Sequence, residues 1–145
     1  MKVLTLLLAV FALWGGQPPA GLDAVRAEPR ADKRYEKALD FASEQITVAR
    51  KDYRDGRIEQ FRQCVENVGE AVKVCDQTLR GTGKNPSKSP KHFKRAEMRM
   101  REIIRRLTGL EGDVSVEDRG VIAKVKTSVQ EIHDNLLFDI MGRRK

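Results

Sequence analysis

The stretch SPKHFKRAEMRMREIIRRLTGL, residues 89–110, has the pattern of a long helix with one apolar face. Ser89 can cap such a helix, and Pro90 suits the first helical position because no N–H donor is needed there. The apolar residues follow one another at steps of three and four, which places them on a single face. They are Phe93, Ala96, Met100, Ile103, Leu107 and Leu110. The stretch therefore predicts a helix over about 90–108 that packs against other helices.

The same stretch concentrates positive charge, because only Glu97 and Glu102 oppose seven cations. These candidate site residues are Lys91, Lys94, Arg95, Arg99, Arg101, Arg105 and Arg106. Helical phase places four of them farthest from the apolar face, namely Lys94, Arg95, Arg101 and Arg105. Lys84 and Lys88, in the preceding loop, would extend this surface. We hypothesise that it binds an anionic partner, since clustered exposed cations attract phosphates and carboxylates.

Three other segments share this apolar periodicity, which predicts an all-α chain. The four expected helices cover residues 32–55, 57–80, 90–108 and 116–141. Asp32 and Ser115 are candidate N-caps. The stretch 81–89 is rich in Gly, Ser and Pro and predicts a flexible loop, and the stretch 108–113 predicts a turn. Helices of similar length with one apolar stripe each favour an antiparallel up-down-up-down four-helix bundle, forming one domain over 28–145.

The apolar positions of the four helices predict a shared core. We expect the following side chains to be buried because each lies on the apolar stripe of its helix: Leu39, Ile46, Phe61, Val68, Val72, Phe93, Ile103, Leu107, Ile122, Val129, Ile132 and Leu136. Loss of a buried isoleucine side chain beyond Cβ destabilises proteins by about 2–5 kcal/mol, so this list is testable by substitution.

The first 27 residues have the pattern of a cleaved signal peptide. A positive start is followed by an apolar run from Val3 to Trp14, and Val25-Arg26-Ala27 fits the small-residue rule before a cleavage point. An uncleaved anchor is the alternative, but such a run spans only about 18 Å of a hydrocarbon core of about 30 Å. Cleavage after Ala20 is a second alternative. The predicted location is therefore periplasmic or extracellular, with no membrane-spanning segment after cleavage.

The net charge of +7 is unevenly distributed. Residues 84–106 contain nine Lys or Arg and two Glu, whereas residues 107–140 contain three Lys or Arg and seven Asp or Glu. The acidic last helix would partly neutralise the basic one if the two packed together, leaving an ordinary solvated surface. Nucleic acid is a disfavoured partner, because export removes the chain from it and no outward aromatic side chains interleave with the cations.

The two cysteines do not predict an internal disulfide. Cys64 and Cys75 are eleven residues apart on one expected helix, or about 16 Å along its axis, whereas a disulfide requires Cα atoms within about 7 Å. We expect two small core residues. The alternative for an exported protein is an intermolecular bridge through Cys64.

No catalytic or metal-binding pattern is found in the sequence. Di-iron bundles use a Glu three residues before a His, but Ser89 and Gln130 stand three residues before His92 and His133. The expected helix 32–55 contains neither Met nor His, which disfavours haem ligation. We therefore expect no enzyme activity, no cofactor and no metal, and a cofactor-binding electron carrier is the least favoured function.

The favoured function is a non-catalytic binding or adaptor module whose partner is an anionic envelope component or an acidic protein. One alternative lies in the same compartment. The sequence Leu107-Thr108-Gly109-Leu110-Glu111 resembles the Leu-Thr-x-x-Gln motif of small periplasmic chaperones and stress adaptors, with Glu in place of Gln. This resemblance would imply a chaperone or stress-adaptor role.

Overall fold

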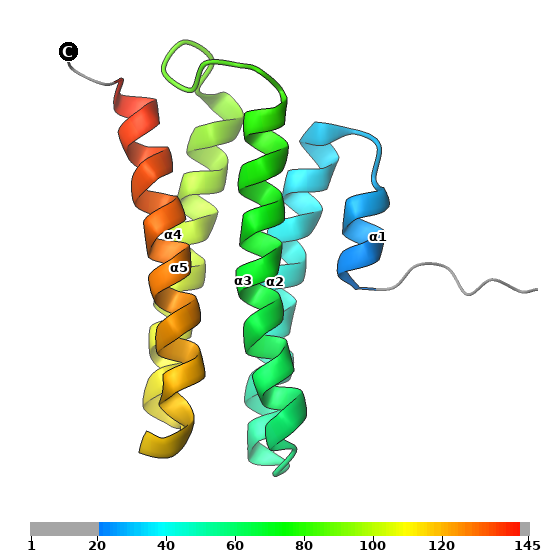
Figure 1. The fold of residues 1–145 in the computed structure, drawn as a ribbon, viewed down its shortest axis with the longest axis vertical. Helices are drawn as coiled ribbons and strands as arrows, with labels where there is room; N and C mark the ends of the chain where they lie inside the picture. Colours follow the sequence, from blue (N-terminus) through cyan, green and yellow to red (C-terminus); the bar gives the residue numbers. More distant parts are fainter. Residues whose placement is uncertain (1–20, 143–145) are drawn as a thin grey trace, which may run out of the picture.

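The computed structural model describes residues 21–142, and within this range the chain is helical and contains no strand (Figure 1). The elements are α1 (Leu22–Ala27), α2 (Ala31–Arg54), α3 (Ile58–Gly81), α4 (Lys91–Asp113), a short 3-10 helix η1 (Val116–Asp118) and α5 (Arg119–Met141). The predicted all-α helical bundle is confirmed. Most of the predicted signal peptide lies outside the described residues. No helix between residues 21 and 142 is both long and apolar enough to span a membrane.

The bundle consists of two helical hairpins, α2–α3 and α4–α5. Figure 1 shows that the connections lie at alternate ends of the bundle: the turn 55–57 and the segment 114–118 at one end, the loop 82–90 at the other. Helix α3 packs mainly on α2 and α5, and α4 on α5 and α2, whereas α3 and α4 make few contacts. The loop 82–90 therefore crosses the end of the bundle diagonally, from α3 to α4.

Helix α4 is longer than predicted. It continues through Gly109 to Asp113, although Thr108-Gly109 was expected to start a turn. Its last turns are held by Leu110 and Val114, which are buried in the core. Apolar burial at these two positions outweighs the roughly 1 kcal/mol that a glycine costs inside a helix.

Helices α2 and α5 end at glycines, and Ser115 is the N-cap of η1, whereas the caps expected at Asp32 and Ser89 are wrong. Gly56 and Gly142 follow α2 and α5 with φ values of 75° and 74°, the left-handed region that glycine tolerates. Arg30 and Pro90, rather than Asp32 and Ser89, occupy the N-cap positions of α2 and α4. Neither makes a side-chain capping hydrogen bond, so these helix starts are fixed by packing rather than by local capping.

One continuous core runs through the four long helices. Every side chain in the predicted list is buried except Ile132, which is half-buried at the edge of the core. Helix α5 contacts α3 and α4 but not α2, so its buried face is narrower than the sequence pattern suggested. Gly69 shows how closely the helices approach, because a Cβ there would lie 3.4 Å from a methyl group of Val125 on α5.

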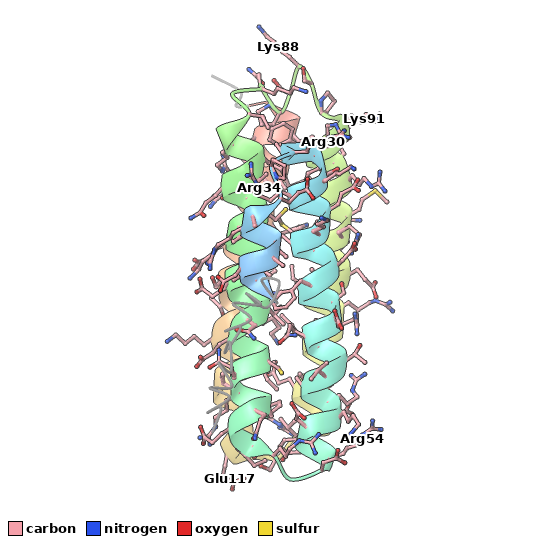
Figure 2. The ribbon with its side chains drawn as sticks, turned by 90° about the vertical axis from the view of Figure 1, so that its right-hand side faces the viewer. Arg30, Arg34, Arg54, Lys88, Lys91 and Glu117 are labelled. Carbon is pink, nitrogen blue, oxygen red and sulfur yellow. The ribbon has the colours of Figure 1, made fainter. Side chains whose placement is uncertain are left out.

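Helix α1, whose residues fall within the predicted signal peptide, packs across α2 and α3 (Figure 2). Val25 is only 5% exposed, and Leu22 is partly buried against the core. The backbone at Gly21 approaches the ring of Phe41. A chain that begins at Gly21 keeps this packing, whereas a chain cleaved after Ala27 loses it.

We expect a chain beginning at Glu28 to fold but to be less stable than one beginning at Gly21. The free energy of unfolding should be lower by about 2 kcal/mol, because Val25 is the one deeply buried side chain of α1. Chemical denaturation of the two purified chains measures this difference. Failure of the chain from Glu28 to fold would show that the bundle requires α1. Intact-mass spectrometry of the protein recovered from cells would identify its natural start.

Candidate anion-binding surface

Two arginines of α4 are paired with carboxylates of α2. Arg95 Nη1 lies 3.1 Å from Glu36 Oε1, and Arg99 Nη2 lies 2.7 Å from Asp40 Oδ1. Within residues 21–142, no cation of α4 is paired with a carboxylate of α5. The alternative prediction, in which the acidic last helix neutralises the basic one, therefore needs correction. Helix α2 supplies the interhelical carboxylates, because α4 also packs beside α2.

Two further arginines are paired within α4 itself. Arg101 lies one turn after Glu97 and bonds its carboxylate at 2.5 Å. Arg105 holds both oxygens of Glu102, with donor–acceptor distances of 2.9 and 2.7 Å. This guanidinium lowers the pKa of the Glu102 carboxyl below its ordinary value. Four of the seven candidate site residues are thus in ion pairs.

The three remaining candidate residues differ in their contacts. Arg106 donates a hydrogen bond of 2.7 Å from Nη2 to Thr47 Oγ1 of α2. Lys91 and Lys94 are exposed in the first turns of α4, and no carboxylate of the described chain lies within 4 Å of either ammonium group. Uncompensated charge on α4 is therefore greatest near its N-terminus.

Lys84 and Lys88, on the loop before α4, are likewise without an ionic partner among residues 21–142. We call Lys84, Lys88, Lys91 and Lys94 the lysine cluster. Residues 80–95 contain no Asp or Glu at all. Figure 2 shows Lys88 and Lys91 at the same end of the bundle as Arg30. The structure thus brings Lys84 and Lys88 together with the N-terminal part of the predicted surface.

The loop that carries this cluster contains its own hydrogen bonds. Asn85 Oδ1 accepts bonds from the N–H and the hydroxyl of Ser87 at 2.9 and 2.8 Å, and its carbonyl accepts from Ser89 N–H at 2.8 Å. Thr82 Oγ1 donates to the Leu79 carbonyl at 2.6 Å. The flexibility predicted for 81–89 stays a prediction.

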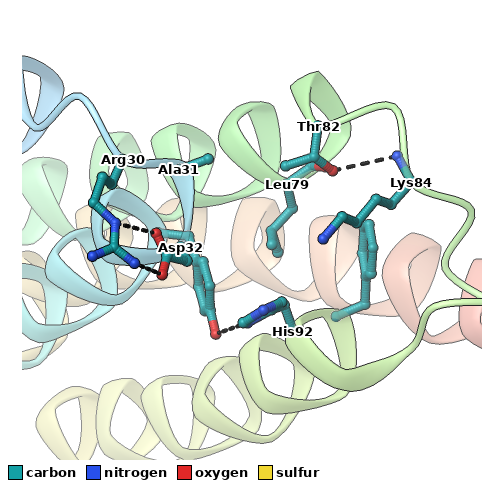
Figure 3. A pocket seen from close by; sticks show the side chains of 9 residues that line it. Arg30, Ala31, Asp32, Leu79, Thr82, Lys84 and His92 are labelled. Atoms are coloured by element: carbon teal, nitrogen blue, oxygen red, sulfur yellow. Dashed lines mark hydrogen bonds and ion pairs between the residues drawn. The ribbon is translucent and has the colours of Figure 1, made fainter.

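Beneath the loop lies a cavity of about 420 Å³ between the start of α2, the end of α3 and the start of α4 (Figure 3). Its lining residues are Arg30, Ala31, Asp32, Tyr35, Leu79, Thr82, Lys84, His92 and Phe93. Arg30 is bonded to both oxygens of Asp32, at 3.2 and 2.6 Å, so these two charges compensate each other. Lys84 is the cation of the cavity that remains unpaired.

Tyr35 and His92 join α2 to α4 at this cavity. The tyrosine hydroxyl lies 2.9 Å from His92 Nδ1 and 3.4 Å from Glu36 Oε1, and the two rings meet edge to face at 5.5 Å. Burial, and secondarily the carboxylate of Glu36, raise the pKa of Tyr35 to about 12, so the hydroxyl keeps its proton. The carboxylate can only accept, so the hydroxyl donates to Glu36 Oε1, and Nδ1–H of His92 donates to the hydroxyl oxygen.

A buried polar network joins α4 to α5 on the other side of the basic helix. Glu97 is only 5% exposed, and its Oε1 lies 2.8 Å from His133 Nε2 as well as near Arg101. His133 Nδ1 lies 2.9 Å from Asp134 Oδ1, so only the imidazolium form satisfies both contacts. Burial raises the pKa of Glu97, but the bonds from Arg101 and His133 outweigh it and lower that pKa overall.

Both cysteines are free and buried in α3. Burial and the neighbouring Asp52 raise the pKa of Cys64 to about 11, which keeps the thiol protonated. An intermolecular bridge through Cys64 remains a prediction. In the described part of the chain, no group of three His, Cys, Asp or Glu side chains is arranged to hold a metal ion.

Comparison of the chain with protein families, with curated proteins and with solved structures gives no match.

Proposed function

We propose that this protein is a non-catalytic binding module of the cell envelope that attaches to an anionic lipid surface through the lysine cluster. One observation carries the proposal. The four lysines are exposed and without a carboxylate partner in the described chain, whereas Arg95, Arg99, Arg101 and Arg105 farther along α4 are paired with Glu36, Asp40, Glu97 and Glu102, and Arg106 bonds Thr47. Exposed cations near an anionic membrane surface contribute about 1 kcal/mol each to attachment.

Apolar side chains at the same end of the bundle favour a lipid surface over an acidic protein. Phe138 and Met141, in the last turns of α5, are 56% and 76% exposed. Gly142, which follows them, lies beside Ser87 of the crossing loop. Cations combined with exposed apolar side chains are typical of proteins that bind the membrane interface. Arg143, Arg144 and Lys145 come next in the sequence, outside the described residues.

The structure offers less support for a chaperone role. Leu107 and Leu110, which carry the resemblance to the chaperone motif, are buried in the bundle core. A client-binding motif would have to be accessible, so these two leucines are better explained as packing residues.

We expect the fourfold substitution of the lysine cluster by Gln to weaken binding to phosphatidylglycerol vesicles at least about 100-fold, since four attractive charges are removed. Vesicle sedimentation at low and physiological salt measures this, and binding of the unchanged protein should fall steeply with salt because exposed charges are screened. Vesicles of phosphatidylcholine should bind neither protein.

A matched control removes ion pairs of α4 with both of their members, so that no carboxylate is left uncompensated. Substituting Arg95, Arg99 and Arg105 together with Glu36, Asp40 and Glu102 by Gln should leave most of the vesicle binding intact, because these charges already neutralise each other. Equal loss of binding in both variants would show that the whole basic helix, rather than the lysine cluster, is the surface. Absence of binding to phosphatidylglycerol vesicles at low salt would exclude the lipid surface.

A further inference from the structure

We infer that the cavity under the crossing loop binds a small organic acid, that is, a carboxylate attached to a compact apolar or aromatic body. At about 420 Å³, the cavity has the size of small-molecule sites in proteins. It combines apolar walls with a single uncompensated cation. This site is separate from the proposed attachment to lipid, and its ligand is a free small molecule.

The apolar part of the site is preformed. Tyr35, Leu79 and Phe93 line the cavity with side chains that are otherwise buried in the core. The contact between Tyr35 and His92 fixes both rings, because it combines a hydrogen bond of 2.9 Å with edge-to-face packing. These three side chains are only 1–2% exposed, so a ligand would meet a small, fixed apolar floor that suits a flat or short apolar body.

The polar part of the site selects a carboxylate. Figure 3 shows the side chain of Lys84 extending back over the cavity from the loop. Asp32, the carboxylate in the lining, is held by Arg30 at 3.2 and 2.6 Å, so it leaves the Lys84 charge uncompensated. A ligand carboxylate would bond the ammonium group, whereas a cationic ligand would be repelled by it.

The lining also argues against an extended polyanion as the ligand. A polyanion needs several cations along its length, but only one unpaired cation lines the cavity. The apolar walls would contribute nothing to phosphate binding. A single acidic group on an apolar body uses both features of the cavity.

The test uses 2-naphthoate as the probe and 2-naphthamide as its neutral counterpart of nearly the same shape. Titration calorimetry and NMR of the aromatic side chains should show 2-naphthoate binding with a Kd of about 1 mM or tighter. The amide should bind at least about tenfold more weakly, as should 2-naphthoate to the Lys84→Gln variant, since each loses one charge-assisted hydrogen bond.

Two controls separate this site from the general positive charge and from the lipid surface. Lys88→Gln removes the same charge from the same loop but does not line the cavity, so its affinity for 2-naphthoate should stay within about twofold. Ala31→Leu places three more carbon atoms in the cavity and keeps all four lysines. It should weaken 2-naphthoate binding at least about tenfold by occupying ligand space, and vesicle binding should equal that of the unchanged protein.

Three results would overturn the inference. They are equal affinity for 2-naphthoate and 2-naphthamide, equal weakening by Lys84→Gln and Lys88→Gln, and absence of binding by the unchanged protein at about ten times the expected Kd. Circular dichroism of each variant establishes that the bundle is intact, so loss of binding cannot be confused with loss of folding.

Discussion

Substituting Ile103 by Ala should lower the free energy of unfolding by about 2–5 kcal/mol. Ile103 lies on the inner face of α4 and is completely buried between the helices. Removal of its outer carbons would leave a cavity that the four long helices cannot fill without shifting. Urea denaturation monitored by circular dichroism measures the change, and the denaturant midpoint should fall while the slope remains constant.

Ile132 provides the matched control for this prediction. The sequence pattern treats Ile103 and Ile132 alike, but Ile132 is only half-buried at the edge of α5. Ile132→Ala should therefore cost about 1 kcal/mol, because less apolar surface leaves water at this position. Equal losses for the two variants would mean that the outer edge of α5 is covered, for instance by a second molecule.

Removal of the His133 side chain should lower the free energy of unfolding by about 2–3 kcal/mol, which is a large effect for a residue at the edge of the core. His133 supplies one of the two bonds that compensate the buried carboxylate of Glu97, and Arg101, the other donor, is mostly exposed. Removing one partner of a buried charge leaves that charge undercompensated. His133→Ala should therefore destabilise the bundle more than Asp134→Ala, which removes only the exposed contact.

The same network determines a pH dependence. The pKa of Glu97 in the folded protein lies below its ordinary value of 4.5. Its contribution to stability is thus fully present above about pH 4.5 and is lost as the pH falls through the folded pKa. Glu97→Gln should flatten the decline of stability in this acidic range. A decline of unchanged size in the variant would show that other carboxylates, such as Glu102, account for it.

The fold could be predicted from the sequence because each long helix carries its own apolar stripe. Phe61 and Val68 on α3 and Phe93 and Ile103 on α4 are spaced at helical intervals, and all four are buried. Local patterns failed where packing between distant segments decided the outcome. Helix α4 continues past Gly109 because Leu110 is buried. The diagonal placement of α3 and α4 cannot be read from the sequence of either helix.

The candidate site could be predicted only as a charge concentration. The sequence identifies the cations of α4 but not their partners, because Glu36 and Asp40 are brought beside Arg95 and Arg99 by packing of α2 on α4. The position of Glu97 weakly indicates a buried carboxylate, which the sequence analysis did not predict. It follows Ala96 on the edge of the apolar stripe, where a carboxylate needs a partner. The sequence contains no signal for the cavity, since Tyr35 and His92 are far apart in sequence.

The diagonal loop has a consequence for how the chain assembles. Each hairpin forms from contacts that are local in sequence, so α2–α3 and α4–α5 can form quickly and independently of each other. Their apolar faces then meet at an effective concentration set by the length of the loop 82–90. A loop too short to span the diagonal would leave each hairpin to find its counterpart in another copy of the chain. The loop length therefore determines whether the two halves assemble within one molecule or by domain swapping between two.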